Sequence, residues 1–151
     1  MAVYALTTEG EEALAAATAE TLVQLRGTAN TKSKVIAWGI SFRGVDSTAQ
    51  PVLVTFCRQT TDGTGTAATE VTFDADDSAA GVTGFHTFSS TEPTTGDIIE
   101  QYEIHPQGGL FVREYPPGRE PVIDNVNTSR IGIVANAAAV VNAVAWIQWE
   151  E

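Results

Sequence analysis

Val35-Ile-Ala-Trp-Gly-Ile-Ser-Phe-Arg43 is the stretch of sequence that decides the fold. It alternates large apolar residues with smaller or more polar ones, and the large residues are Ile36, Trp38, Ile40 and Phe42. A period of two is expected of a β-strand with one strongly apolar face. Gly39 in the middle indicates a bulge or a close approach of another layer to the backbone. We expect Trp38 to anchor the hydrophobic core.

Further strand-like runs lie on both sides of this stretch. They occupy residues 2–6, 21–26, 52–57, 70–73, 84–89, 98–105, 110–115, 130–134 and 140–149. About ten short strands, separated by turns rich in Gly, Pro, Thr and Asp, predict an all-β antiparallel sandwich. Within that class we expect a jelly roll, because the chain is long for an immunoglobulin-like domain and both of its ends are strands.

One segment near the N-terminus favours a helix instead. Thr8 and Glu11 have the spacing of a helix-capping box, and the alanine-rich residues 12–19 follow them. Only about two turns are available, so such a helix needs packing to be stable. The sequence therefore predicts at most one short helix. Residues 44–51 are expected to form a polar loop, and the Thr- and Gly-rich residues 60–68 an exposed, mobile one.

Residues 97–124 contain a second distinctive pattern. Two strand-like runs flank Pro106-Gln107-Gly108-Gly109, which predicts a hairpin, and the second run leads into Pro116-Pro117-Gly118-Arg119-Glu120-Pro121. Three prolines within six residues fix φ and remove backbone donors, so this segment cannot lie inside a sheet. We expect a stiff surface loop here that is suited to contact a partner.

Composition narrows the range of functions. The 151 residues fit one domain, 1–151, with a single core, and the formal net charge is −11. The eight basic residues are scattered singly along the sequence, which argues against nucleic acid as a partner. No apolar run approaches the roughly 20 residues that cross a bilayer, and acidic residues follow the N-terminus directly, so neither a membrane span nor a secretory signal is expected.

No residue pattern predicts catalysis. Cys57 is the only cysteine and lies in an apolar strand, where we expect an inert buried thiol. His86 and His105 stand alone, so the His-x-His and Glu arrangement of a cupin metal site cannot be assembled, and a cupin-like metalloenzyme remains only a weak alternative. Asp74, Asp76 and Asp77 match a calcium loop poorly. We therefore predict no catalytic residue, cofactor or metal.

The last strand carries bulk on both faces. Ala143, Ala145, Ile147 and Trp149 alternate with Asn142, Val144, Trp146 and Gln148. A strand that is apolar on both sides is covered on both sides, either inside the sandwich or by a neighbouring subunit.

Five segments together resemble a known family. They are Ala2-Val-Tyr-Ala-Leu-Thr-Thr, Val35-Ile-Ala-Trp-Gly-Ile-Ser-Phe, His105-Pro-Gln-Gly-Gly109, Glu114-Tyr-Pro-Pro-Gly-Arg-Glu-Pro121 and Val144-Ala-Trp-Ile-Gln-Trp-Glu-Glu. The chain looks like the head decoration, or cement, proteins of tailed bacteriophages, over nearly its whole length. The motifs carry no chemistry.

The resemblance implies a TNF-like jelly roll that forms a homotrimer on the outside of the capsid and bridges major capsid subunits. It also implies synthesis in the cytoplasm of the bacterial host. The residues that we expect at interfaces are Arg113, Tyr115, Pro116, Pro117, Arg119, Glu120, Trp146 and Trp149. A phage tail or host-recognition module that binds carbohydrate through Trp146 and Trp149 is the main alternative.

Overall fold

The computed structural model describes residues 1–43 and 50–151, and the alternating stretch lies in its strand β4 (Ser33–Arg43). Trp38 and Ile40 are fully buried, as predicted. Val35 is also buried, although the alternation assigns it to the opposite face. The reason is a shift in the pairing of β4 with its neighbour between Val35 and Ala37, which turns Val35 inward.

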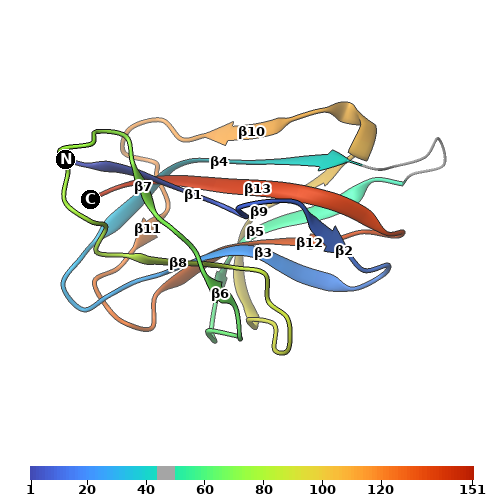
Figure 1. The fold of residues 1–151 in the computed structure, drawn as a ribbon, viewed down its shortest axis with the longest axis horizontal. Helices are drawn as coiled ribbons and strands as arrows, with labels where there is room; N and C mark the ends of the chain where they lie inside the picture. Colours follow the sequence, from blue (N-terminus) through green and yellow to red (C-terminus); the bar gives the residue numbers. More distant parts are fainter. Residues whose placement is uncertain (44–49) are drawn as a thin grey trace.

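Two antiparallel sheets make up the described part of the chain. The first sheet contains, in pairing order, β10 (Phe111–Glu114), β4, β13 (Val141–Glu150), β1 (Val3–Thr7) and β7 (Val71–Thr72), while β11 (Val122–Ile123) pairs with β4 and β2 (Glu12–Leu14) pairs with β13. The second contains β6 (Thr66–Ala67), β8 (Thr83–His86), β3 (Ala19–Arg26), β12 (Arg130–Asn136), β5 (Val52–Gln59) and β9 (Thr95–Ile104). The two sheets lie one above the other, and the two chain ends lie side by side (Figure 1).

The pairing of the longer strands gives a jelly roll. Eight of them follow each other along the chain as β1, β3, β4, β5, β9, β10, β12 and β13. The first pairs with the last, the second with the seventh, the third with the sixth and the fourth with the fifth. A long antiparallel ribbon wrapped in this way has jelly-roll topology. The predicted all-β sandwich of jelly-roll type is confirmed.

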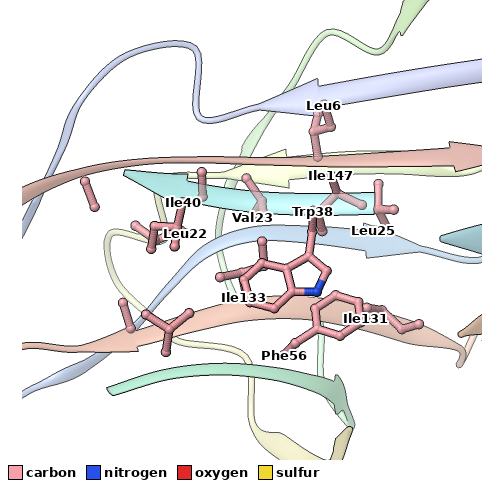
Figure 2. Close-up of a cluster of buried hydrophobic side chains, with 14 of the residues drawn as sticks. Leu6, Leu22, Val23, Leu25, Trp38, Ile40, Phe56, Ile131, Ile133 and Ile147 are labelled. Carbon is pink, nitrogen blue, oxygen red and sulfur yellow. The ribbon is translucent and has the colours of Figure 1, made fainter. Parts of the chain in front are cut away.

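The core lies between the inner faces of the two sheets. Trp38 of the first sheet stacks on Phe56 of the second, with ring centroids 5.3 Å apart. Ile131 and Ile133 of β12 lie beside this pair, and Leu6 of β1 lies farther along the same core, beyond Ile147 (Figure 2). Trp38 is therefore the core anchor that the sequence predicts. Truncating it to alanine would lower the free energy of unfolding by about 3 to 5 kcal/mol.

The helix predicted for residues 12–19 is wrong. Strand β2 begins at Glu12, and Ala17 has a φ of 55°, which no helix residue adopts. The backbone amide of Ala17 donates to the carbonyl of Ala137 at 2.7 Å. Pairing with distant strands therefore overrides the helix propensity of alanine, which is weak in so short a segment.

The hairpin predicted between residues 98–105 and 110–115 is also wrong. Both strands exist, but β9 pairs with β5 in the second sheet and β10 pairs with β4 in the first. A short 3-10 helix, η1 (Pro106–Gly108), carries the chain from one sheet to the other, and Gly109 follows it with a φ of 84°. The side chain of His105 accepts a hydrogen bond from the amide of Gln107 at its start. This segment is a corner of the sandwich.

The chain between β5 and β9 covers two sheet edges. Strand β8 pairs with the outer edge of β3, and β7 pairs with the outer edge of β1. Residues 60–68 are mostly exposed, as predicted, but their backbone is held in place. Buried Gln24 donates to the carbonyl of Thr61 at 3.1 Å, and Arg26 donates to the carbonyl of Asp62. The loop is thus anchored to the second sheet.

Residues 44–49, which form most of the polar loop predicted at 44–51, lie outside the described residues. Among those described, no helix is long and apolar enough to cross a membrane.

Candidate functional site

A surface groove of about 540 Å³ opens where the gap between the sheets meets the proline-rich segment. Five of the residues predicted at interfaces line it: Arg113, Tyr115, Pro116, Arg119 and Glu120. The remaining lining residues are Arg58, Ile99, Glu100 and Pro121, which come from β5, β9 and the end of the proline-rich segment. Strand–loop–strand packing therefore brings together residues that are more than 60 positions apart in sequence.

The proline-rich wall is a defined turn. The amide of Arg119 donates to the carbonyl of Pro116 at 3.0 Å, and Gly118 has a φ of 86°. Proline at the second position and a left-handed glycine at the third are typical of a type II turn. The carboxylate of Glu120 accepts from the amide of Gly118 at 2.7 Å and so stabilises the turn. Pro117 is exposed at the tip and does not line the groove.

The floor of the groove joins the two sheets. Arg113 on β10 makes two-pronged hydrogen bonds to Glu100 on β9, with nitrogen–oxygen distances of 3.0 to 3.2 Å. Tyr115 donates from its hydroxyl to Glu100 at 2.9 Å, and that hydroxyl accepts from the indole nitrogen of Trp38 at 3.2 Å. Burial and the neighbouring Glu100 carboxylate raise the pKa of Tyr115 above its usual range, so the phenol stays neutral.

Two arginines at the groove have no carboxylate partner among residues 1–43 and 50–151. Within those residues, Arg58 donates only to the backbone carbonyl of Val122, at 3.1 Å. Arg119 is exposed, and its guanidinium group makes no hydrogen bond or ion pair with a described residue. Both groups therefore keep most of their donors free for a ligand.

A second, neighbouring cavity of about 380 Å³ shares Arg58 with the groove and is also lined by Arg130. Four of the eight lysine and arginine residues in the sequence, Arg58, Arg113, Arg119 and Arg130, thus line two adjoining hollows. The sequence shows these residues as scattered singles. Folding gathers them on one side of an otherwise acidic protein, which single-sequence reasoning missed because they come from separate strands.

The two tryptophans of β13 lie away from the groove. Trp149 is fully buried, stacks on Tyr4 with centroids 5.6 Å apart, and donates from its indole nitrogen to Glu151 at 3.0 Å. It cannot contact a partner surface, so its place among the interface residues is corrected. Trp146 is half-buried on the outer face, where its ring covers Gly39 so closely that a built Cβ there would lie 2.6 Å away. A group does approach Gly39 closely, but it is a side chain of the paired strand β13 in the same sheet and not the other layer that the sequence suggested.

The outer face of the first sheet is a second candidate surface. Directly paired residues share a face, so Thr7, Trp146, Gly39 and Val112 form one row across four strands. Val144 and Ser41 form the next row. Neither row contains a charged side chain.

Ion pairs bound this face at both ends of the strands. Arg43 pairs with Glu11 at 2.8 Å at one end, and Lys34 pairs with Glu150 at 3.4 Å at the other. Val71 on β7 and Val112 on β10 remain 58% and 42% exposed at its two edges. Glu114 also lies on this face, in the row that Ala37, Gln148, Ala5 and Val71 form. The uncharged strip is therefore limited to the two rows through Trp146 and Val144, and charged residues border it on a protein of net charge −11.

The remaining reactive groups are sequestered or solitary. Cys57 is buried, and desolvation raises the pKa of its thiol to about 11, as expected of an inert core cysteine. His86 is buried near Glu9 and Glu12, whereas His105 is exposed at the corner between the sheets. Asp74 closes a local turn by accepting from the amide of Asp76. In the described part of the chain, no group of three or more histidine, cysteine or acidic residues is arranged to hold a metal ion.

No protein-family model, curated protein or solved structure matches the chain. The groove and the uncharged face are therefore the two features from which a function can be argued.

Proposed function

We propose that the protein is a capsid decoration protein of a tailed bacteriophage, which binds the outside of the head as a homotrimer and bridges major capsid subunits. The observation that carries this proposal is the groove. Its proline wall and its Glu100–Arg113 floor are ordered within a single copy of the chain. A surface that is already ordered loses little conformational entropy when a partner binds, and tyrosine and arginine are favoured at binding hot spots.

The uncharged face supports the trimeric part of the proposal. A protein with 19 acidic residues repels its own copies unless the contacting surfaces lack that charge. The rows through Trp146 and Val144 offer such a surface over the middle of the first sheet. Closed symmetric association would bury this strip and leave the groove, which opens at the edge formed by β9 and β10, free for the capsid.

The stabilising effect follows from linkage. A protein that binds the assembled shell but not its separated subunits lowers the free energy of the shell by its binding energy. Bridging adjacent subunits makes their separation require loss of those contacts. Decoration would therefore raise the temperature at which heads rupture and their resistance to the pressure of packaged DNA.

Co-sedimentation with empty, expanded capsids tests this function, together with light scattering of the free protein. We expect binding that Arg119→Ala weakens by roughly 10-fold, because an arginine at a hot spot contributes about 1 to 2 kcal/mol. Lys32→Ala is the matched control, since Lys32 is exposed and lies outside the groove. A wild-type protein that remains monomeric and does not sediment with capsids would reject the proposal.

A further inference from the structure

We infer that the groove recognises a segment of its protein partner that carries a carboxylate between apolar residues. This inference rests on the proposed function, because it specifies the chemistry of the partner at the proposed contact. The inference is based on three features of the groove: free guanidinium groups, apolar walls and the Glu100 carboxylate, which Arg113 and Tyr115 already bind there.

The free positive charge lies at Arg58 on β5 and at Arg119 in the proline-rich segment. Arg58 uses one donor for the carbonyl of Val122, and Arg119 uses none of its side-chain donors within the described chain. Guanidinium groups bind carboxylates through two parallel hydrogen bonds, which makes this the ligand class that they recognise best among protein side chains. The neighbouring Glu120 accepts from the amide of Gly118, and it forms no ion pair with either arginine in the described part of the chain.

The apolar walls favour a peptide over a polyanion. Ile99, Pro116 and Pro121 line the same groove as the two arginines. A nucleic acid needs an extended track of positive charge, and the net charge of −11 would repel its phosphates. A peptide with a single carboxylate between apolar residues is attracted by the two nearby arginines. Because it carries only one negative charge, the net charge of the protein repels it much less than it repels a nucleic acid.

The groove already holds one carboxylate in the required manner. Glu100 accepts two-pronged hydrogen bonds from Arg113 and a third from Tyr115, at 2.9 to 3.2 Å. This internal pair occupies Arg113 and leaves Arg58 and Arg119 for the incoming group. Arg113 is therefore a structural arginine, whereas Arg58 and Arg119, which line the same groove, are available to recognise a ligand.

Titration of ¹⁵N-labelled protein with a blocked peptide, acetyl-Ala-Leu-Glu-Leu-Ala-amide, tests the inference, and the same peptide with Gln in place of Glu is the control ligand. We expect millimolar binding of the Glu peptide, with shifted amide signals around the proline turn, and at least about 5-fold weaker binding of the Gln peptide. Arg119→Gln and Arg58→Gln should each weaken the Glu peptide roughly 3- to 10-fold. Arg119→Lys should retain part of the affinity, and Lys32→Gln should change nothing.

Several results would overturn the inference. These are equal affinity for the two peptides, no binding of either at about 5 mM, shifts confined to other surfaces, or stronger binding of a short oligonucleotide than of the Glu peptide. Capsid sedimentation separates the two proposals. Wild-type capsid binding that is unaffected in the Arg58→Gln/Arg119→Gln double variant would reject only the inference, whereas peptide binding without capsid binding would reject only the decoration function.

Discussion

Gly39 and Trp146 illustrate how one residue sets the position of another. Gly39 lies on the outer face of β4, and the indole ring of Trp146 occupies the space where a side chain would project. The alternating sequence around Gly39 indicated a close approach but not the identity of the approaching group. That group comes from a strand more than 100 residues later, and no local pattern specifies such a pairing.

Substituting Gly39→Ala should displace the Trp146 ring and destabilise the protein. The added methyl group would lie 2.6 Å from the indole, well inside contact distance, so we expect a loss of about 1 to 3 kcal/mol. Urea unfolding monitored by tryptophan fluorescence measures it, and the native emission should also shift as Trp146 becomes more exposed. Gly10→Ala is the control because nothing lies within 4 Å of its added Cβ. Equal stability of the two variants would contradict the packing described.

Cys57 should be unreactive in the folded protein. Its thiol is buried and its pKa is raised to about 11, so the thiolate is scarce at neutral pH and inaccessible to reagents. We expect Ellman's reagent to label the native protein at the rate of unfolding and to label urea-unfolded protein within seconds to minutes. Rapid labelling of the native state at pH 8 would show that the second sheet opens at β5.

Glu92 gives stability a defined dependence on pH. Burial and the nearby charges of Glu20 and Glu12 raise the pKa of Glu92, although its hydrogen bond from the amide of Thr21 opposes the shift. Because the pKa of Glu92 is higher in the folded state, its contribution to the free energy of unfolding is fully present below its unfolded pKa, roughly 4.3. That contribution is lost as the pH rises through the pKa of the folded state. At neutral pH the ionised Glu92 therefore costs stability.

The substitution Glu92→Gln should remove this cost while keeping an oxygen acceptor for Thr21. We expect the melting temperature to rise by about 1 to 3 °C at pH 7, since partly exposed charges contribute less than about 1 kcal/mol, and the difference to vanish near pH 3.5. Glu103→Gln, at an exposed position on β9, controls for the general effect of removing one negative charge. A gain that persists at pH 3.5, or that Glu103→Gln reproduces, would refute this assignment.

At the scale of the element, the sequence predicts strands better than it predicts their partners. Alternation located β4, β5, β9, β10 and β13 because side-chain burial is a local signal. The sequence wrongly predicts that β9 and β10 pair with each other, because a four-residue connection favours a hairpin, whereas the η1 turn redirects the chain to the other sheet. The proline-rich wall of the groove could be predicted from the sequence. Arg58 and Ile99 could not be assigned to the groove, because they lie beside that wall only when the chain crosses from one sheet to the other at η1.

The Glu100–Arg113 pair should therefore behave as an inter-sheet tie. Glu100→Ala removes the acceptor for both Arg113 and Tyr115, and we expect a loss of about 1 to 2 kcal/mol. A double-mutant cycle with Arg113→Ala should give a favourable but small coupling energy, because both groups are partly exposed. Additive single effects in urea unfolding would mean that the pair does not join the sheets energetically.

At the scale of the whole molecule, the distribution of charge matters more than its total. The composition predicted an acidic surface, but it could not predict that folding leaves the middle of the first sheet uncharged and gathers arginines around the groove beside β9 and β10. Those arrangements depend on which strands become neighbours. Net charge is a property of the sequence, whereas a patch is a property of the topology.

A charge placed on the uncharged face should separate the proposed trimer without unfolding the chain. Val112→Asp changes a residue that is 42% exposed on this face, so we expect light scattering to report a monomer, with a melting temperature that changes mainly through the lost association. Leu53→Asp, at a residue 37% exposed on the second sheet, is the matched control and should leave the mass unchanged. Loss of association in both variants, or in neither, would rule out this face as the subunit contact.

The central place of β13 also determines when the protein can fold. β13 lies between β4 and β1, and its residue Glu150 is paired with Val3 at the other end of the chain. The first sheet therefore cannot be completed during synthesis until β13 has left the ribosome. At about 5 to 20 residues per second, β1 waits roughly 7 to 30 s with an unpaired edge. Contacts so distant in sequence also form slowly, on the order of milliseconds to seconds. The risk of aggregation is thus greatest while the chain is being made, and the strand that arrives last closes the sheet on which the first strand depends.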